Sequence, residues 1–63
     1  MTFQNACKLT SGDYCYVPSR KEACKILAVQ QDHEEQRVWI KVRISMYATT
    51  TLTHRDVEPD GNQ

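Results

Sequence analysis

The stretch RVWIKVRI, residues 37–44, decides the fold class of this chain. Its apolar members alternate strictly with the other residues, and they are Val38, Ile40, Val42 and Ile44. A period of two places each set of side chains on one face of a β-strand, whereas a helix would scatter the apolar set around its axis. Most of these apolar residues are β-branched, which favours extended backbone. The stretch therefore predicts a strand with one buried face and one solvent face.

Two shorter runs nearer the N-terminus carry the same signal. The first, residues 14–17, follows a turn-forming Ser-Gly-Asp sequence and ends at Pro18. The second, residues 23–29, has the length of a strand and is bracketed by turns. Its alternation slips at Leu27, Ala28 and Val29, which predicts a β-bulge that bends the strand.

The polar residues 30–36 connect the second run to the 37–44 strand. They lack the Asn-Gly or Asp-Gly pair of the tightest turns, so we expect a wide loop or extended hairpin arms. Downstream, consecutive threonines in residues 49–52 predict a fourth strand, because branching at Cβ favours extended backbone. Residues 53–56 then predict a single helical turn, and residues 57–59 a last short strand.

This order of elements resembles the SH3-like and Tudor-like small β-barrels, over roughly residues 11–59. The resemblance rests on pattern and order, and no motif in it is specific to one family. It implies an all-β fold: a small SH3-like barrel of about five short antiparallel strands, with a one-turn helix before the last strand. Closure of the barrel would hide its edges. Residues 1–10 are expected to form an N-terminal segment that is ordered in part, with its first six residues candidates for fraying, and residues 60–63 a frayed tail.

Length and charge limit the functions that this chain can have. Its 63 residues make one domain, and 8 Lys and Arg against 8 Asp and Glu argue against indiscriminate nucleic-acid binding. The longest uncharged apolar run, residues 26–29, is far shorter than the roughly 20 residues of a membrane span. The first residues lack the basic start and apolar stretch of a secretory signal. We therefore expect a cytoplasmic protein with no membrane partner.

The cysteines and histidines do not form a recognisable chemical motif. Cys7, Cys15 and Cys24 are odd in number and lack the close pairing of zinc ligands, so a zinc site with His33 or His54 is disfavoured. We expect reduced thiols, with the second and third cysteines acting as small core residues. No phosphate-binding glycine loop or nucleophile elbow occurs. The sequence thus predicts no metal, no cofactor and no enzymatic activity.

The solvent face of the 37–44 strand interleaves three cations with one indole: Arg37, Trp39, Lys41 and Arg43. Such a strip can hold phosphates while the ring stacks on a base, and this makes RNA or DNA binding the alternative function. Arg20 and Lys21 would extend that surface. The plain alternative is that strand surfaces are commonly charged and that Trp39 packs against a neighbouring strand.

Aromatic residues suggest a protein-binding surface, which is the leading prediction. The expected surface comprises Tyr14, Tyr16, Trp39, Lys41, Arg43 and Tyr47. In Tudor-like barrels, rings that converge cage a methylated Lys or Arg, because the faces of the rings attract a cation. The predicted function is therefore a non-enzymatic binding module with a protein partner. Association into a homo-oligomer is a further expectation, since a domain this small gains stability by covering apolar surface.

Overall fold

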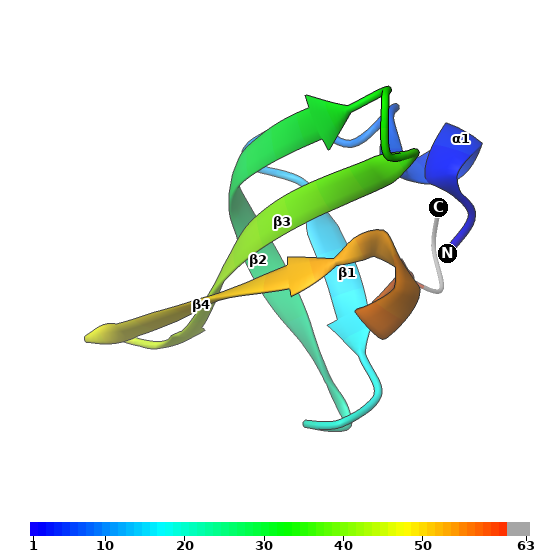
Figure 1. The fold of residues 1–63 in the computed structure, drawn as a ribbon. Helices are drawn as coiled ribbons and strands as arrows, with labels where there is room; N and C mark the ends of the chain where they lie inside the picture. Colours follow the sequence, from blue (N-terminus) through cyan, green and yellow to red (C-terminus); the bar gives the residue numbers. More distant parts are fainter. Residues whose placement is uncertain (61–63) are drawn as a thin grey trace.

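The computed structural model describes residues 1–60, and their strands pair into one antiparallel sheet (Figure 1). The strands are β1 (Tyr14–Val17), β2 (Glu22–Asp32), β3 (Arg37–Ser45), β4 (Ala48–Thr53) and β5 (Glu58–Pro59). A short helix, α1 (Phe3–Ala6), precedes them, and a 3-10 turn, η1 (His54–Asp56), separates β4 from β5. The five antiparallel strands and the single turn before the last one confirm the predicted fold class.

The sheet has the order β4-β3-β2-β1-β5 and is not closed into a barrel, so the prediction of closure was wrong. Its two edges are β4 and β5. The last strand, β5, has only two residues, and the register partners of both lie on β1. The second residue of β5 is Pro59, which has no N–H to donate to a ladder. With two residues, one of them without an N–H, β5 offers few ladder hydrogen bonds, and within residues 1–60 it pairs with β1 and not with β4.

The slip in alternation around Leu27 is a β-bulge, as predicted. Ile26 pairs with Val42 and Ala28 pairs with Lys41, so Leu27 is the extra residue. Beyond it, β2 continues as far as Asp32, and β2 and β3 form extended hairpin arms. A bulge bends its strand and increases the local twist, and β2 curves strongly in Figure 1.

The inner face of the sheet carries the core. Val38, Ile40 and Val42 are each 0% exposed, and the residues between them are exposed, which confirms the alternation predicted for this stretch. They pack with buried residues of the other strands and the N-terminal segment: Ala6, Leu9, Cys15, Val17, Cys24, Ile26 and Val57. Burial of each Val or Ile side chain contributes about 1.5–3 kcal/mol relative to exposure.

The first six residues are ordered, although they were candidates for fraying. The Thr2 side chain accepts a hydrogen bond from the Asn5 N–H and so caps α1. The amino nitrogen of Met1 donates to the Val57 carbonyl oxygen at 2.9 Å, and Ala6 is completely buried. These long-range contacts hold a helix that is too short to be stable alone. Of the predicted tail, residues 61–63 lie outside the described part of the chain.

The turn η1 is held by hydrogen bonds between the residues that flank and end it, and by the buried side chain of His54. Thr53 donates from its backbone N–H and its hydroxyl to the Asp56 carboxylate, at 3.3 and 3.0 Å. His54 is buried, and its Nδ1 accepts a hydrogen bond from the Val38 N–H at 3.3 Å. The Phe3 ring meets the His54 ring edge to face at 6.0 Å. The predicted helical turn is therefore confirmed, and its histidine joins β3 to the N-terminal segment.

Candidate functional site

The solvent side of β3 presents the four side chains that the sequence predicted for it. Arg37, Trp39, Lys41 and Arg43 are all exposed, and they alternate with the buried core residues of the same strand. Trp39 retains 37% of its surface in solvent. One strand therefore contributes three core residues on one face and a strip of three cations and one indole on the other.

The register of the sheet adds residues from both neighbouring strands to this surface. Directly paired residues point to the same side, so Lys25 joins Arg43, Ala28 joins Lys41, and Gln30 joins Trp39. Three threonines of β4 pair with the same β3 residues. Asp32 likewise joins Arg37. We call this surface the outer face, and it comprises Lys25, Ala28, Gln30, Asp32, Arg37, Trp39, Lys41, Arg43, Thr49, Thr51 and Thr53.

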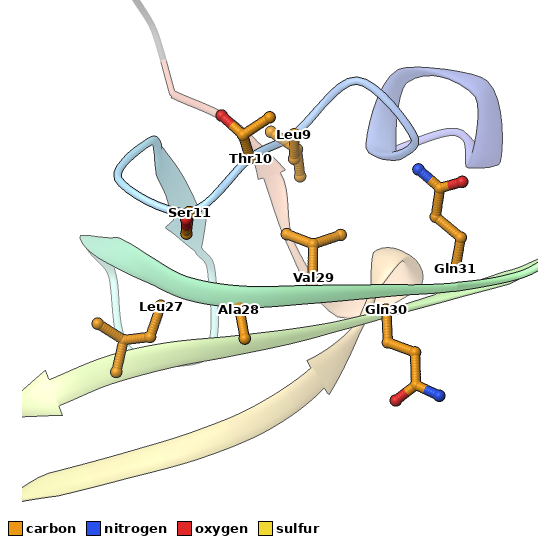
Figure 2. Close-up of a pocket in the computed structure, with 8 residues that line it drawn as sticks. All are labelled: Leu9, Thr10, Ser11, Leu27, Ala28, Val29, Gln30 and Gln31. Atoms are coloured by element: carbon orange, nitrogen blue, oxygen red, sulfur yellow. The ribbon is translucent and has the colours of Figure 1, made fainter.

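Figure 2 shows why two of these residues belong to the outer face. Ala28 and Gln30 leave β2 on one side, and Val29 and Gln31 leave it on the other. That other side borders a groove of about 680 Å³ whose second wall is Leu9, Thr10 and Ser11. The groove lining carries no charged residue. The bulge at Leu27 therefore sets which residues of β2 lie beside the charged strip of β3.

Three cations of the outer face form a cluster. Lys25 and Arg43 are direct partners, which places their Cβ atoms roughly 5 Å apart. Lys41 lies two residues along β3 from Arg43, a rise of about 7 Å. Within residues 1–60, the only ion pair joins Arg20 and Glu22. The cation cluster of Lys25, Lys41 and Arg43 therefore has no carboxylate partner in that range, and its positive charge is available to an anionic ligand.

Trp39 lies at one end of the outer face and borders a hollow. The Arg37 guanidinium carbon is 5.3 Å from the centre of the indole ring, in a cation–π contact. A shallow hollow of about 350 Å³ lies beside the ring. We call it the Trp39 hollow, and its lining is Ala28, Val29, Gln30, Trp39, Lys41 and Thr51.

The aromatic residues of the predicted protein-binding surface do not gather in one place. Tyr14 and Tyr16 lie on β1, opposite Lys25 and Ala23. From the register, Tyr14 is two strands and four residues away from Trp39, roughly 10 Å across the sheet and 14 Å along it. Tyr47 occupies the turn after β3, where it is 94% exposed. These positions are too far apart for one cage around a methylated side chain.

The other two predicted cations also lie apart from the cluster. Arg20 and Lys21 belong to the turn between β1 and β2. The Arg20 side chain donates to the Glu22 carboxylate at 2.9 Å, which offsets its charge locally. Lys21 has a positive φ of 55° that closes this turn. The structure therefore separates this pair from the strip on β3 with which the sequence had grouped it.

Several members of the outer face were not predicted. Lys25, Gln30 and the β4 threonines became neighbours of the strip only through strand register, which alternation within one strand does not define. The slip at Leu27 was the available signal, because an extra residue reverses which later side chains of β2 point outward. The slip therefore predicts the side of β2 on which Gln30 lies, whereas its pairing with Trp39 comes from the register.

The thiols have no place at the outer face. Cys15 and Cys24 are buried opposite each other on β1 and β2, as core residues, which agrees with their predicted role. Burial, with a smaller contribution from Cys24, raises the pKa of the Cys15 thiol to about 11, so it stays protonated and unreactive at neutral pH. In residues 1–60, no three His, Cys, Asp or Glu side chains are grouped so that they could hold a metal ion.

Comparison of the chain with protein-family models, with curated proteins and with solved structures gave no match. Across residues 1–60, neither the length nor the hydropathy of any helix suits a membrane span. The features that bear on function are therefore the outer face, with its cation cluster and its indole, and the exposed turn between β3 and β4.

Proposed function

We propose that this protein is a non-catalytic binding module that holds single-stranded nucleic acid across the outer face. The observation that carries the proposal is the cation cluster on the same face as Trp39. Lys25, Lys41 and Arg43 occupy adjoining register positions without a carboxylate partner in residues 1–60. A polyanion is the ligand that such a cluster attracts most strongly.

The spacing of the groups suits an extended strand. Trp39 lies about 14 Å along β3 from Arg43, and Lys41 lies between them. Phosphates can contact the cations while a base stacks on the indole, which is how proteins bind single strands without reading their sequence. The hydroxyls of the exposed Thr49 and Thr51 add hydrogen-bond donors for phosphate or sugar oxygens.

The zero net charge fits a ligand bound at one face. The chain carries 8 cations and 8 anions, so long-range attraction over its whole surface is small. Binding would depend on the local field of three cations, and its affinity would be modest. Contacts between the ligand and the outer face would then contribute the binding free energy that long-range attraction does not provide.

The same proposal places the chain with the SH3-like small β-proteins. Five antiparallel strands and a 3-10 turn before the last strand support this assignment. The open gap between β4 and β5 is a departure from a closed barrel. In an SH3-like arrangement, the outer face is a broad surface built from the three consecutive strands β2, β3 and β4.

The first test measures binding of a labelled oligothymidylate of about fifteen nucleotides by fluorescence anisotropy at several salt concentrations. Contact of the cluster with three phosphates predicts a slope of log affinity against log salt of about −2. Affinity should therefore fall about 16-fold between roughly 50 and 200 mM salt. Absence of binding at the lowest salt would refute the proposal.

A matched pair of triple variants separates the cation cluster from general charge. The triple substitution Lys25→Gln, Lys41→Gln and Arg43→Gln should remove most of the salt-dependent binding, because Arg37 is then the last cation of the outer face. Three exposed cations elsewhere, Lys8, Lys21 and Arg55, are replaced by glutamine in the control. Both variants lose the same charge, and the control should keep most of the affinity. Equal losses would mean that the outer face is not the site.

The second candidate function is protein binding, and the turn between β3 and β4 supports it. Met46 is 77% exposed and Tyr47 is 94% exposed, side by side at this turn. Met and Tyr are enriched at protein interfaces, and two such residues in full solvent are an apolar projection. This candidate ranks second because Tyr14, Tyr16 and Trp39 do not converge with Tyr47.

The protein-binding candidate has its own test. A protein captured by the wild type and identified by mass spectrometry should be lost with Met46→Ser and Tyr47→Ser together. The same protein should still bind a Trp39→Ala variant, since Trp39 lies at the other end of β3. Sedimentation of the free chain over a range of concentrations checks whether the captured partner is a second copy. Unchanged capture by the serine variant contradicts this candidate.

A further inference from the structure

We propose that the Trp39 hollow is a subsite for one nucleobase, with a preference for bases that carry keto oxygens. This inference rests on the proposed function and specifies which part of the ligand the outer face recognises. The hollow lies next to the cation cluster, and Lys41 belongs to both. A base that enters the hollow would therefore leave its phosphates against the cations.

The hollow exists because a small side chain lies among larger ones. Ala28 pairs with Lys41, which in turn pairs with Thr51, and the next row across the sheet holds Gln30 and Trp39. The methyl group of Ala28 leaves a gap that these longer side chains surround. The volume of about 350 Å³ is at the lower end of the roughly 300–1,000 Å³ of ligand pockets, which suits one planar ring system.

Trp39 supplies a ring surface on which a base can stack. The Arg37 guanidinium carbon lies 5.3 Å from the ring centre, so this exposed side chain covers part of the indole. The ring is nevertheless 37% exposed and lines the hollow. A base that enters the hollow would stack on the part of the ring that borders it.

The hydrogen-bond donors and acceptors at the rim of the hollow indicate which bases would fit it. Gln30 offers one acceptor and an NH₂ donor, Thr51 a hydroxyl, and Lys41 donors only. Within residues 1–60, these three side chains have no hydrogen bond or ion pair of their own. Lysine donors match the keto oxygens of thymine, uracil and guanine, whereas adenine has no carbonyl oxygen. The paired N–H and keto groups of thymine or uracil also complement the two ends of the Gln30 amide.

The experiment compares three deoxyribose strands that differ in their bases, and adds one ribose strand. The probes, each of about twelve nucleotides, are an oligothymidylate, an oligouridylate, an oligoadenylate and an abasic deoxyribose-phosphate strand. One stacked base predicts that the abasic strand binds about 5- to 150-fold more weakly than oligothymidylate. Thymine should also quench Trp39 fluorescence, and adenine should bind more weakly than thymine. The oligouridylate shows whether a 2′-hydroxyl changes the affinity.

A variant that fills the hollow tests the location without removing any cation. Ala28→Leu should lower oligothymidylate affinity to that of the abasic strand and leave the salt dependence unchanged. The matched control is Ala23→Leu, the same substitution at an exposed position of β2 opposite Tyr16, outside the hollow. Circular dichroism checks that both variants fold. If Ala28→Leu fails to fold, Gln30→Leu replaces it, and the ratio of thymine to adenine affinity should then fall towards one.

The outcomes separate the subsite from the proposed function. If no strand binds, the proposed function fails and the subsite fails with it. If all four strands bind equally and Ala28→Leu has no effect, the outer face holds nucleic acid through phosphates only, and the subsite alone is refuted. Loss of the base-dependent part of the affinity in Ala28→Leu, with the control unaffected, supports the subsite.

Discussion

The two faces of β3 differ in solvent exposure and in residue type, although their residues alternate along one backbone. On the inner face, Val38, Ile40 and Val42 have no exposed surface. On the outer face, Trp39 and Lys41 stand between them in solvent. The inner side chains pack against the N-terminal segment and β1, whereas the outer ones lie outside this core cluster. The core residues therefore lie on one face of the strand, and the proposed binding surface lies on the other.

Because of this difference, substitutions on the outer face should affect the stability of the fold far less than substitutions on the inner face. A domain of this length is stabilised by roughly 3–9 kcal/mol, so few core residues can be changed without unfolding it. Changes on the outer face cost little, because exposed positions away from special contacts usually alter stability by less than about 0.5 kcal/mol. A binding surface can therefore differ in sequence while the fold stays the same.

The largest expected effect comes from the inner face. Ile40→Ala removes a fully buried side chain and leaves a cavity between β3 and its neighbours. The free energy of unfolding should fall by about 2–5 kcal/mol, measured by urea denaturation followed by circular dichroism. Because the total stability is roughly 3–9 kcal/mol, this loss is a large share of it, and the urea midpoint should move to a much lower concentration.

The neighbouring outer position provides the control for that substitution. Lys41→Ala should change the free energy of unfolding by less than about 0.5 kcal/mol. If the two alanine variants had similar stability, the division of β3 into a stabilising face and a binding face would be wrong.

The second effect concerns the buried histidine that links β3 to η1. Burial, followed by the nearby charges of Arg55, the N-terminal amino group and Arg37, lowers the pKa of His54, and Asp56 opposes this more weakly. The folded protein therefore keeps its imidazole neutral below the ordinary pKa of about 6.5, whereas the unfolded chain takes up a proton there. Stability should fall as the pH drops through 6.5 and below, by at most about 1.4 kcal/mol per pH unit from this group.

The two histidines of the chain separate this effect from general acid sensitivity. Urea unfolding at about pH 7.5 and about pH 5 should show a smaller difference for His54→Gln than for the wild type. Glutamine keeps an oxygen that can accept the hydrogen bond from the Val38 N–H but does not titrate in this range. His33→Gln makes the same substitution at the exposed histidine of the turn after β2, and it is the control for the change of residue type. An unchanged pH dependence in His54→Gln would rule out the buried histidine as its source.

Much of the fold could be predicted because it depends on local pattern. Alternation in residues 37–44 located β3 to within one residue, and the slip at Leu27 located the bulge. The continuation of β2 to Asp32 was not fixed by its own polar residues, since it depends on pairing with the far end of β3. Helix α1 escaped prediction because its stability comes from contacts with Val57 and the core. Closure was predicted from the number of strands, but within residues 1–60 the two-residue β5 pairs with β1 and not with β4.

The candidate site was only partly predictable, for a related reason. The strip on β3 follows from alternation within one strand, so its four residues could be predicted as neighbours. The cation cluster and the Trp39 hollow depend on which residues of β2 and β4 lie opposite β3. A one-residue change in register would turn Lys25 and Ala28 to the other face. The dispersal of the tyrosines likewise depends on how many strands separate β1 from Trp39.

The smallest expected effect is that of Arg37→Gln, which tests whether a contact within the outer face contributes to stability. The Arg37 guanidinium lies 5.3 Å from the centre of the Trp39 ring, and exposed cation–π pairs contribute about 0.5–1 kcal/mol. Arg37→Gln should therefore lower the free energy of unfolding by no more than that amount and shift the tryptophan emission. Arg43→Gln removes the same charge from the same face but lies four residues from the ring, so its emission should match the wild type. A loss in Arg37→Gln as large as that in Ile40→Ala would mean that the outer face also stabilises the fold, and its residues would then not be free to vary with the ligand.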